Sequence, residues 1–225
     1  MIKIVLFFFI CPVLGFCQNV YLEDVVGVDL EYYSQIIDSD WGDLDGDSIA
    51  EGVLVVNVLD SIDFGAIRDV IVIKQNNNIW SLWKSSSSAV LGSADGGVFG
   101  DPFQAINIED NRIYISHMGG SNWRWSYTDE YSFVNDQFIL ISHFSYWGSL
   151  CDEKADFDFD LKSGKIIYSV DKEECPEGFG DNSHLSGLLP ISEEFLYPNL
   201  KINFKNRYDS IINIVSPNHG FEMSL

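Results

Sequence analysis

Repeated turn signals between alternating apolar residues constrain this chain more than any other feature. Short Asn, Asp or Gly turns occur at residues 76–78, 110–111, 135–136 and 163–164, and each lies between two segments of alternating apolar and polar residues. This arrangement is the short-range signal of a β-hairpin. We therefore expect an all-β fold of antiparallel hairpins or a meander, either propeller-like or sandwich-like.

The individual segments refine this expectation. The runs VLVVNV (residues 53–58) and DVIVIK (69–74) are apolar at nearly every position, as in strands buried on both faces. The segment SNWRWSYTDEYSF (121–133) alternates strictly, as in a half-buried antiparallel strand. Residues 30–38 and 191–198 are candidates for one or two short helices.

The N-terminus has the pattern of a secretory signal peptide. Lys3 precedes a short apolar run, and the small residues Gly15 and Cys17 precede a cleavage position before Gln18. We expect residues 1–17 to be removed, residues 18–225 to form a single all-β domain with a less certain tail from about 185, and the product to be periplasmic or secreted. The alternative is a lipoprotein anchored through Cys17, which Phe16 fits poorly. No later segment is long enough for a transmembrane helix.

Two cysteines remain after this cleavage, Cys151 and Cys175, and an even pair in an exported protein predicts a disulfide. The net charge of −21 argues against binding to nucleic acid or anionic lipid through charge. It suits a soluble surface, a cation or a basic partner.

The segment WGDLDGDSIAEGVLVV places four acidic side chains just before a buried strand. With Asp43 as position 1, Asp45, Asp47 and Glu51 fall at positions 3, 5 and 9, and Ile49 supplies a backbone carbonyl at position 7. Ca²⁺ takes six to eight oxygen ligands in a flexible geometry and suits such a loop better than Mg²⁺. The alternative is an acidic turn that is solvated and holds no ion.

Position 12 of an EF-hand should be Glu, but Leu54 stands there, and a strand follows instead of a helix. The loop resembles the integrin-type FG-GAP calcium loop, which lies between two strands. That resemblance covers about 15 residues and implies Ca²⁺ held by Asp43, Asp45, Asp47, Glu51 and the Ile49 carbonyl. It departs from the family at Ser48, where glycine is usual, and in having Glu at position 9. Only one such loop is present, so a full propeller is not implied.

From about residue 41 to 142 the chain also resembles a group of uncharacterised bacterial exported proteins that pair one acidic loop with a GGS-x-WRW strand. The resemblance brings no known activity. In the strand itself, Trp123, Arg124 and Trp125 are candidates for ligand contact, because exposed Trp and Arg stack on sugars or peptides. The alternative is that both tryptophans fill the core.

Catalytic motifs are absent: the four histidines lack metal-protease spacing, and no nucleophile elbow or phosphate-binding loop occurs. We expect a non-enzymatic, calcium-binding β domain that binds a protein or glycan in the cell envelope. One alternative is a calcium-dependent hydrolase of glycan or peptide that uses Asp156 or Asp158 of the DFDFD segment. Another is an acidic inhibitor or immunity-type protein that masks a basic partner.

Overall fold

The computed structural model of the protein describes residues 21–29, 31–59, 65–178, 180, 183–185, 187, 190–198, 200–209 and 211–225. The predicted signal peptide, with Cys17, lies outside the described residues. Within them, the regular structure is β-strand apart from two short 3₁₀ turns, η1 (Leu22–Asp24) and η2 (Ser183–Leu185). The all-β prediction is confirmed. No helix in this part of the chain has the length and apolar character needed to cross a membrane.

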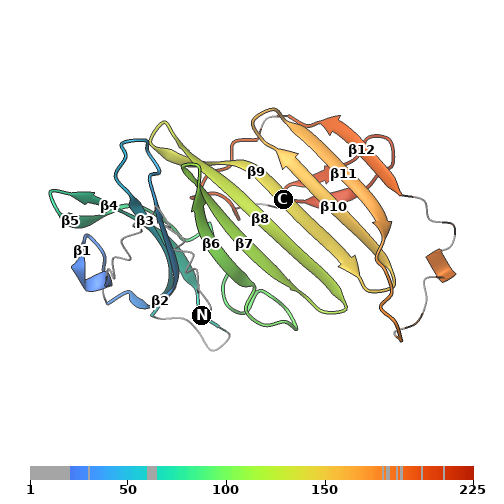
Figure 1. Ribbon diagram of the computed structural model, residues 1–225, viewed down its shortest axis with the longest axis horizontal. Helices are drawn as coiled ribbons and strands as arrows, with labels where there is room; N and C mark the ends of the chain where they lie inside the picture. Colours follow the sequence, from blue (N-terminus) through green and yellow to red (C-terminus); the bar gives the residue numbers. More distant parts are fainter. Residues whose placement is uncertain are drawn as a thin grey trace, which may run out of the picture.

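Two antiparallel meanders make up most of the fold (Figure 1). One is a five-stranded sheet in the order β1-β5-β4-β3-β2, in which only β1 pairs in parallel. The other is a curled seven-stranded sheet in which β6 to β12 are neighbours in chain order. The first sheet contains β1 (Val25–Val26), β2 (Tyr33–Gly42), β3 (Glu51–Val58), β4 (Arg68–Asn76) and β5 (Ile79–Ser86). The second contains β6 (Phe103–Glu109), β7 (Arg112–Gly120), β8 (Trp123–Val134), β9 (Gln137–Ser149), β10 (Glu153–Asp160), β11 (Lys165–Lys172) and β12 (Ile191–Leu196).

The hairpin turns lie where the sequence predicts them. Three connections, at 77–78, 110–111 and 135–136, have two successive residues with positive φ between 49° and 65°. Positive φ at both central residues defines the type I′ turn, whose twist matches that of the flanking strands, and Asn and Asp tolerate it well. The fourth turn uses Gly164, with φ 76°, between β10 and β11.

Both predicted helices are wrong. Residues 33–42 form β2, which pairs with β3 through two irregularities in register, and residues 191–196 form β12, which pairs with β11. Helices of two turns are marginal by themselves, because nucleation is unfavourable and few hydrogen bonds follow it. In both places the neighbouring strand offers unpaired backbone groups, so sheet pairing is favoured over local helix propensity.

Strands β3 and β4 are buried on both faces, as their continuous apolar runs predict. Val53 and Val55 of β3 belong to the main core, which also contains Ile113 and Ile115 of the seven-stranded sheet. Leu54 and its alternate neighbours face a second, smaller core that is closed by Trp41 and Trp80. The main core is therefore shared by the two sheets.

Side chains of β2 satisfy the edge of the seven-stranded sheet. Asp38 Oδ2 accepts a hydrogen bond from Ile106 N at 3.2 Å, and Asp40 Oδ2 accepts one from Ile108 N at 2.6 Å. Because an edge strand exposes unpaired N–H groups, these two carboxylates both cover that edge and join the sheets.

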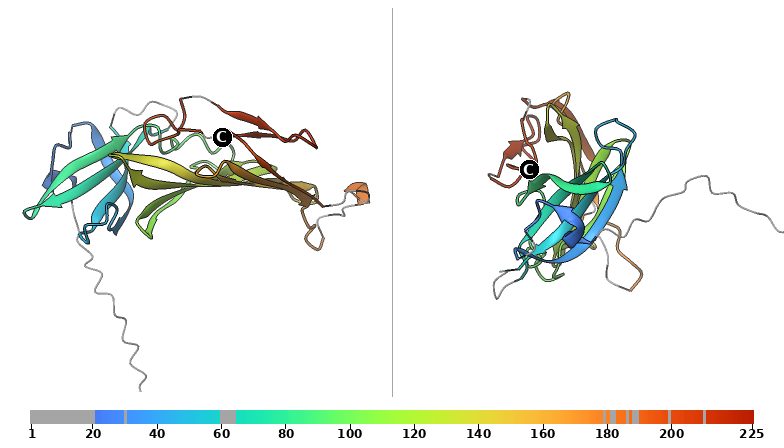
Figure 2. Two further views of the ribbon diagram at one scale, coloured as in Figure 1. Left: turned by 90° about the horizontal axis from the view of Figure 1, so that it is seen from above. Right: turned by 90° about the vertical axis from the view of Figure 1, so that its left-hand side faces the viewer.

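The C-terminal segment lies along one face of the seven-stranded sheet (Figure 2). It contains the hairpin of β13 (Asn213–Val215) and β14 (Glu222–Ser224). Phe204, Ile214 and Met223 from this segment pack in the main core with sheet residues such as Phe157 and Ile166. The segment thus covers the concave side of the curled sheet.

Cys151 and Cys175 form the predicted disulfide, with their Cα atoms 4.4 Å apart. Cys151 precedes β10 and Cys175 follows β11, so the bond closes the open end of the β10–β11 hairpin. A disulfide is compatible with an oxidising compartment, such as the one that secreted and periplasmic proteins occupy.

Replacing both Cys151 and Cys175 with serine should lower the free energy of unfolding by about 3 kcal/mol, because the cross-link limits the unfolded chain. Urea denaturation of the oxidised protein and the double variant measures this difference. The reduced wild-type protein serves as the control and should match the variant. A loss below about 1 kcal/mol would show that the disulfide does not stabilise the fold.

His117 on β7 is buried as a neutral imidazole. Its Nε2 atom accepts a hydrogen bond from Leu91 N at 3.2 Å, and its ring packs against those of Phe103 and Tyr127. Burial lowers the pKa of His117 from 6.5 to about 4, and this effect exceeds the attraction of the Asp129 carboxylate. The folded protein therefore holds His117 neutral at pH values where the unfolded chain protonates it.

Stability should consequently fall as the pH falls from 6.5 to about 4, because the unfolded state takes up a proton that the folded state does not bind. The full effect of His117 is about 3 kcal/mol. His117→Gln retains a hydrogen-bond acceptor and should flatten this part of the profile relative to the wild type. His184→Gln, at an exposed histidine, is the matched control for the substitution itself. Denaturation at several pH values tests both variants, and parallel profiles for wild type and His117→Gln would contradict the assignment.

Candidate functional site

The acidic loop between β2 and β3 is organised by its own carboxylates. Asp43 Oδ1 accepts a hydrogen bond from Gly46 N at 2.7 Å, and Oδ2 accepts one from Ser48 N at 2.9 Å. Gly46 and Ser48 have positive φ values of 84° and 66°. Ser48 thus adopts the left-handed conformation expected at position 6, where glycine would be less strained.

Asp45 and Asp47 also accept hydrogen bonds from the loop backbone. Asp47 Oδ1 accepts from Ile49 N at 2.8 Å, and Asp45 Oδ1 accepts from Asp47 N at 3.3 Å. The Ile49 side chain is exposed. The loop therefore turns several of its backbone N–H groups toward its own carboxylates.

Glu51 is the most unusual member of the loop, because it is fully buried. It is the first residue of β3, and its Oε2 atom accepts a hydrogen bond from Leu44 N at 2.8 Å. Its Oε1 atom has no hydrogen-bond partner among the described residues. Burial raises the pKa of Glu51, and the nearby carboxylates of Asp45 and Asp47 add to that effect.

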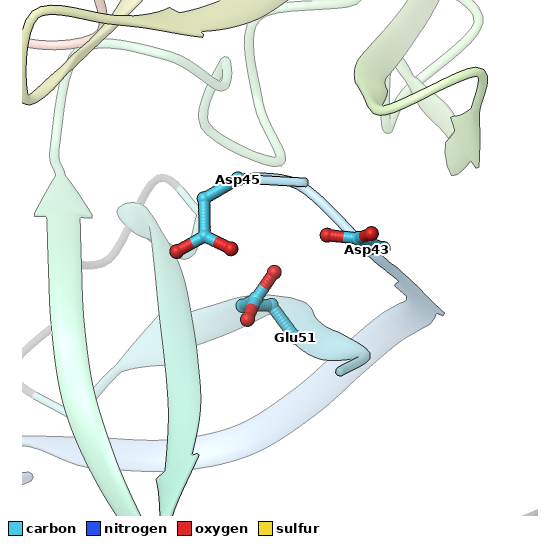
Figure 3. A group of neighbouring side chains, drawn as sticks. All are labelled: Asp43, Asp45 and Glu51. Carbon is cyan, nitrogen blue, oxygen red and sulfur yellow. The ribbon is translucent and has the colours of Figure 1, made fainter. Parts of the chain in front are cut away.

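Three of the predicted ligands converge on one point (Figure 3). Oxygens of Asp43, Asp45 and Glu51 lie within 4.8 Å of one another. Two oxygens on opposite sides of one Ca²⁺ are separated by about 4.8 Å, twice the usual Ca–O distance of about 2.4 Å. The separations are therefore compatible with a common cation. Asp47 is not part of this three-carboxylate group.

Sequence reasoning missed Lys74, which lies at this site. Its Nζ atom donates hydrogen bonds to Asp45 and Asp47, the latter at 2.8 Å, and lies 3.5 Å from Glu51 Oε1. The last distance exceeds the usual N–H···O limit of about 3.2 Å, so Glu51 Oε1 gains charge attraction but no good hydrogen bond. Burial lowers the pKa of Lys74, but its two carboxylate hydrogen bonds raise it more, so the ammonium stays protonated.

Lys74 reaches the loop because of strand register. Gly52 pairs with Ile73 in the β3–β4 ladder, so the next step along each strand brings Glu51 and Lys74 to adjacent positions. The only sequence signal was a basic residue ending the apolar run DVIVIK. Its meaning depends on the register, which the sequence does not supply.

Searches against protein-family models, characterised proteins and solved structures gave no match. The resemblance to FG-GAP loops therefore depends on the loop residues themselves.

The aromatic strand β8 divides its side chains between the two faces of the curled sheet. Trp125 lines a cavity on the concave face, whereas Arg124 points to the opposite face because neighbours alternate along a strand. Trp123 stacks on Trp147 of β9, with ring centroids 4.2 Å apart. The structure therefore brings Trp123 and Trp125 to one face and separates Arg124 from them.

The DFDFD segment lies on β10. Ala155 and Phe157 of this strand line the concave cavity, so Asp156 and Asp158 point to the other face of the sheet. These two carboxylates are thus separated from the cavity by the sheet itself.

Lys74→Met should lower the free energy of unfolding by about 2 kcal/mol in the presence of EDTA, because it leaves the carboxylates without their ammonium partner. Lys84→Met is a matched control. Both lysines lie near the Trp83 ring, but the carboxylate partner of Lys84 is the exposed Asp136, so the loss should stay below about 1 kcal/mol. Urea denaturation compares the two variants. Equal losses would contradict a specific role for Lys74 in the acidic loop.

Proposed function

We propose that this protein is an exported, calcium-binding β domain that acts as a non-enzymatic binding or interaction module of the cell envelope. The observation that carries the calcium site is the buried Glu51 carboxylate, whose Oε1 atom lacks a hydrogen-bond partner among the described residues. A buried carboxylate oxygen without a partner is costly, and a cation in front of it removes that cost.

The ligand set favours a hard cation. Asp43 and Asp45 supply carboxylates beside Glu51, and oxygen ligands are those that Ca²⁺ and Mg²⁺ prefer. The loop supplies many oxygens from a flexible segment, which suits Ca²⁺ better than the compact octahedron of Mg²⁺. Asp47 and the Ile49 carbonyl complete the proposed set after a small rearrangement of the loop.

Lys74 and Ca²⁺ compete for the same oxygens in this proposal. The ammonium carries one charge and bonds to Asp45 and Asp47, whereas its distance to Glu51 Oε1 is long. A dication would neutralise more of the local negative charge and bind Glu51 directly. We therefore expect Ca²⁺ to displace Lys74 toward solvent.

The binding role is preferred to a hydrolase role because of where the acidic residues lie. Asp156 and Asp158, the carboxylates of the hydrolase alternative, lie on the face of the sheet opposite the cavity. Export is supported by the disulfide between Cys151 and Cys175. The partner would be a protein or a glycan.

Calcium should raise the free energy of unfolding of the wild-type protein by about 1.5–3 kcal/mol at about 10 mM, given the affinity typical of extracellular calcium sites. Calorimetric titration should give one site. Glu51→Gln should abolish both effects, because its amide keeps the hydrogen bond from Leu44 N but presents no charge to the ion. Asp158→Asn, which removes an exposed carboxylate on β10, is the control and should bind calcium as the wild type does.

Lys74→Met should bind Ca²⁺ at least tenfold more tightly than the wild type, because the competing ammonium is absent. A wild-type protein that shows neither heat nor stabilisation with calcium would refute the proposal. In that case a response in Lys74→Met alone would identify Lys74 as the resident cation of the loop.

A further inference from the structure

A cavity of about 610 Å³ lies between the concave face of the seven-stranded sheet and the C-terminal segment. This volume falls in the range of about 300–1,000 Å³ that is typical of small-molecule sites. The sheet contributes residues from β8, β9, β10 and β11, and the C-terminal segment contributes residues from 207 to 225. Neither the acidic loop nor its ligands take part.

The walls of this cavity are largely apolar and rich in rings. Trp125, Trp147, Phe157 and Tyr168 line it from the sheet, and Met223 lines it from the opposite side. Trp147 is 46 % exposed, which places it at the mouth of the cavity. Flat aromatic walls favour a ring-shaped, mostly apolar occupant through stacking and burial of its surface.

One buried polar network reaches the cavity wall. Asp129 accepts hydrogen bonds from Arg207 Nε at 2.6 Å and Nη2 at 3.3 Å, and His143 Nδ1 lies 2.6 Å from Asp129 Oδ1. His143 and Arg207 both line the cavity, whereas Asp129 is fully buried behind them. Burial raises the pKa of Asp129, but Arg207 and His143 lower it more, to about 2, so its carboxylate is ionised.

The charge of Asp129 determines which atoms of this network donate hydrogen bonds and which accept them. The negative charge of Asp129 is matched by the guanidinium of Arg207, which donates two hydrogen bonds to it. An ionised Asp129 only accepts hydrogen bonds, so His143 Nδ1 carries the proton and donates it. In the neutral imidazole with this tautomer, His143 Nε2 is an acceptor, and it has no hydrogen-bond partner in the described part of the chain.

We propose that this cavity binds a small, largely apolar ring compound that carries one hydroxyl group, and that this hydroxyl donates a hydrogen bond to His143 Nε2. The aromatic walls take the rings, and the histidine fixes the orientation of the hydroxyl. A hydroxyl placed here satisfies a buried acceptor, whereas the same ring compound without a donor leaves it unsatisfied.

Two other ligand classes fit this cavity less well. A sugar presents a hydroxyl group on nearly every ring carbon, whereas most of the surface that lines this cavity is apolar. An anion meets Glu222 at the cavity, and the guanidinium of Arg207 is already bonded to Asp129. A neutral compound with a single donor suits the lining best.

The test uses 2-naphthol and its methyl ether, 2-methoxynaphthalene, which differ only in the hydroxyl hydrogen and a methyl group. We expect 2-naphthol to bind the wild-type chain, and the ether to bind about three- to tenfold more weakly, the usual effect of one hydrogen bond. NMR titration of the protein measures both affinities. Failure of 2-naphthol to bind, or equal affinity for the two compounds, would overturn the proposal.

Variants locate the binding and separate its two elements. His143→Asn keeps a donor for Asp129 but lacks the Nε2 acceptor, so the difference between the two compounds should fall below twofold. Ala155→Phe fills the cavity from β10 and should weaken both compounds at least tenfold. Phe144→Ala, next to His143 but exposed on the convex face, should change neither affinity.

An unchanged affinity in Ala155→Phe would place the binding elsewhere and overturn the proposal, as would a persistent preference for 2-naphthol in folded His143→Asn. The wild-type comparison of the two compounds requires no variant. It therefore decides the matter even if one substitution prevents folding.

Discussion

Strand β3 is buried on both faces, and this constraint places a carboxylate of the acidic loop, that of Glu51, in the protein interior. The valines of this strand and Leu54 join two cores, so its first residue, Glu51, is fully buried. A carboxylate in that position needs compensation. One oxygen receives it from Leu44 N, and the other faces the carboxylates of Asp43 and Asp45. The burial of β3 in the sheet thus places the Glu51 carboxylate beside those of Asp43 and Asp45.

The seven-stranded sheet compensates its own buried carboxylate in a different way. Asp129 is also fully buried, but two groups from this chain, Arg207 and His143, satisfy it completely enough to keep its pKa low. Arg207 belongs to the C-terminal segment, so this ion pair also holds that segment against the concave face. Among the described residues, Glu51 has no comparable pair of partners, because Lys74 bonds mainly to Asp45 and Asp47. That contrast is the physical reason why we propose a metal ion at Glu51 and none at Asp129.

Local patterns in the sequence predicted local structure well. Asn77 and Asn78 adopt the positive φ that a type I′ turn needs, and the disulfide closes the hairpin that its cysteines bracket. Residues 33–42 and 191–196 were predicted as helices and form strands, because pairing with β3 and β11 supplies hydrogen bonds that a short helix lacks.

Contacts between residues far apart in the chain could not be predicted from the sequence, because they depend on how the strands pair and pack. The approach of Lys74 to the acidic loop depends on register, and Arg207 meets Asp129 across 78 residues of chain. The spacing of Asp43, Asp45 and Glu51 indicated a shared site, but it gave no indication that Glu51 is buried or that a lysine lies beside it.

A crystal structure of the protein grown in calcium, with anomalous diffraction to locate the ion, tests the central claim most directly. The account predicts one strong peak about 2.4 Å from oxygens of Asp43, Asp45 and Glu51, with the Lys74 ammonium moved away from Asp45. The account would be contradicted by an electron-density map without such a peak, in which Lys74 still bonds to Asp45 and Asp47 at millimolar calcium.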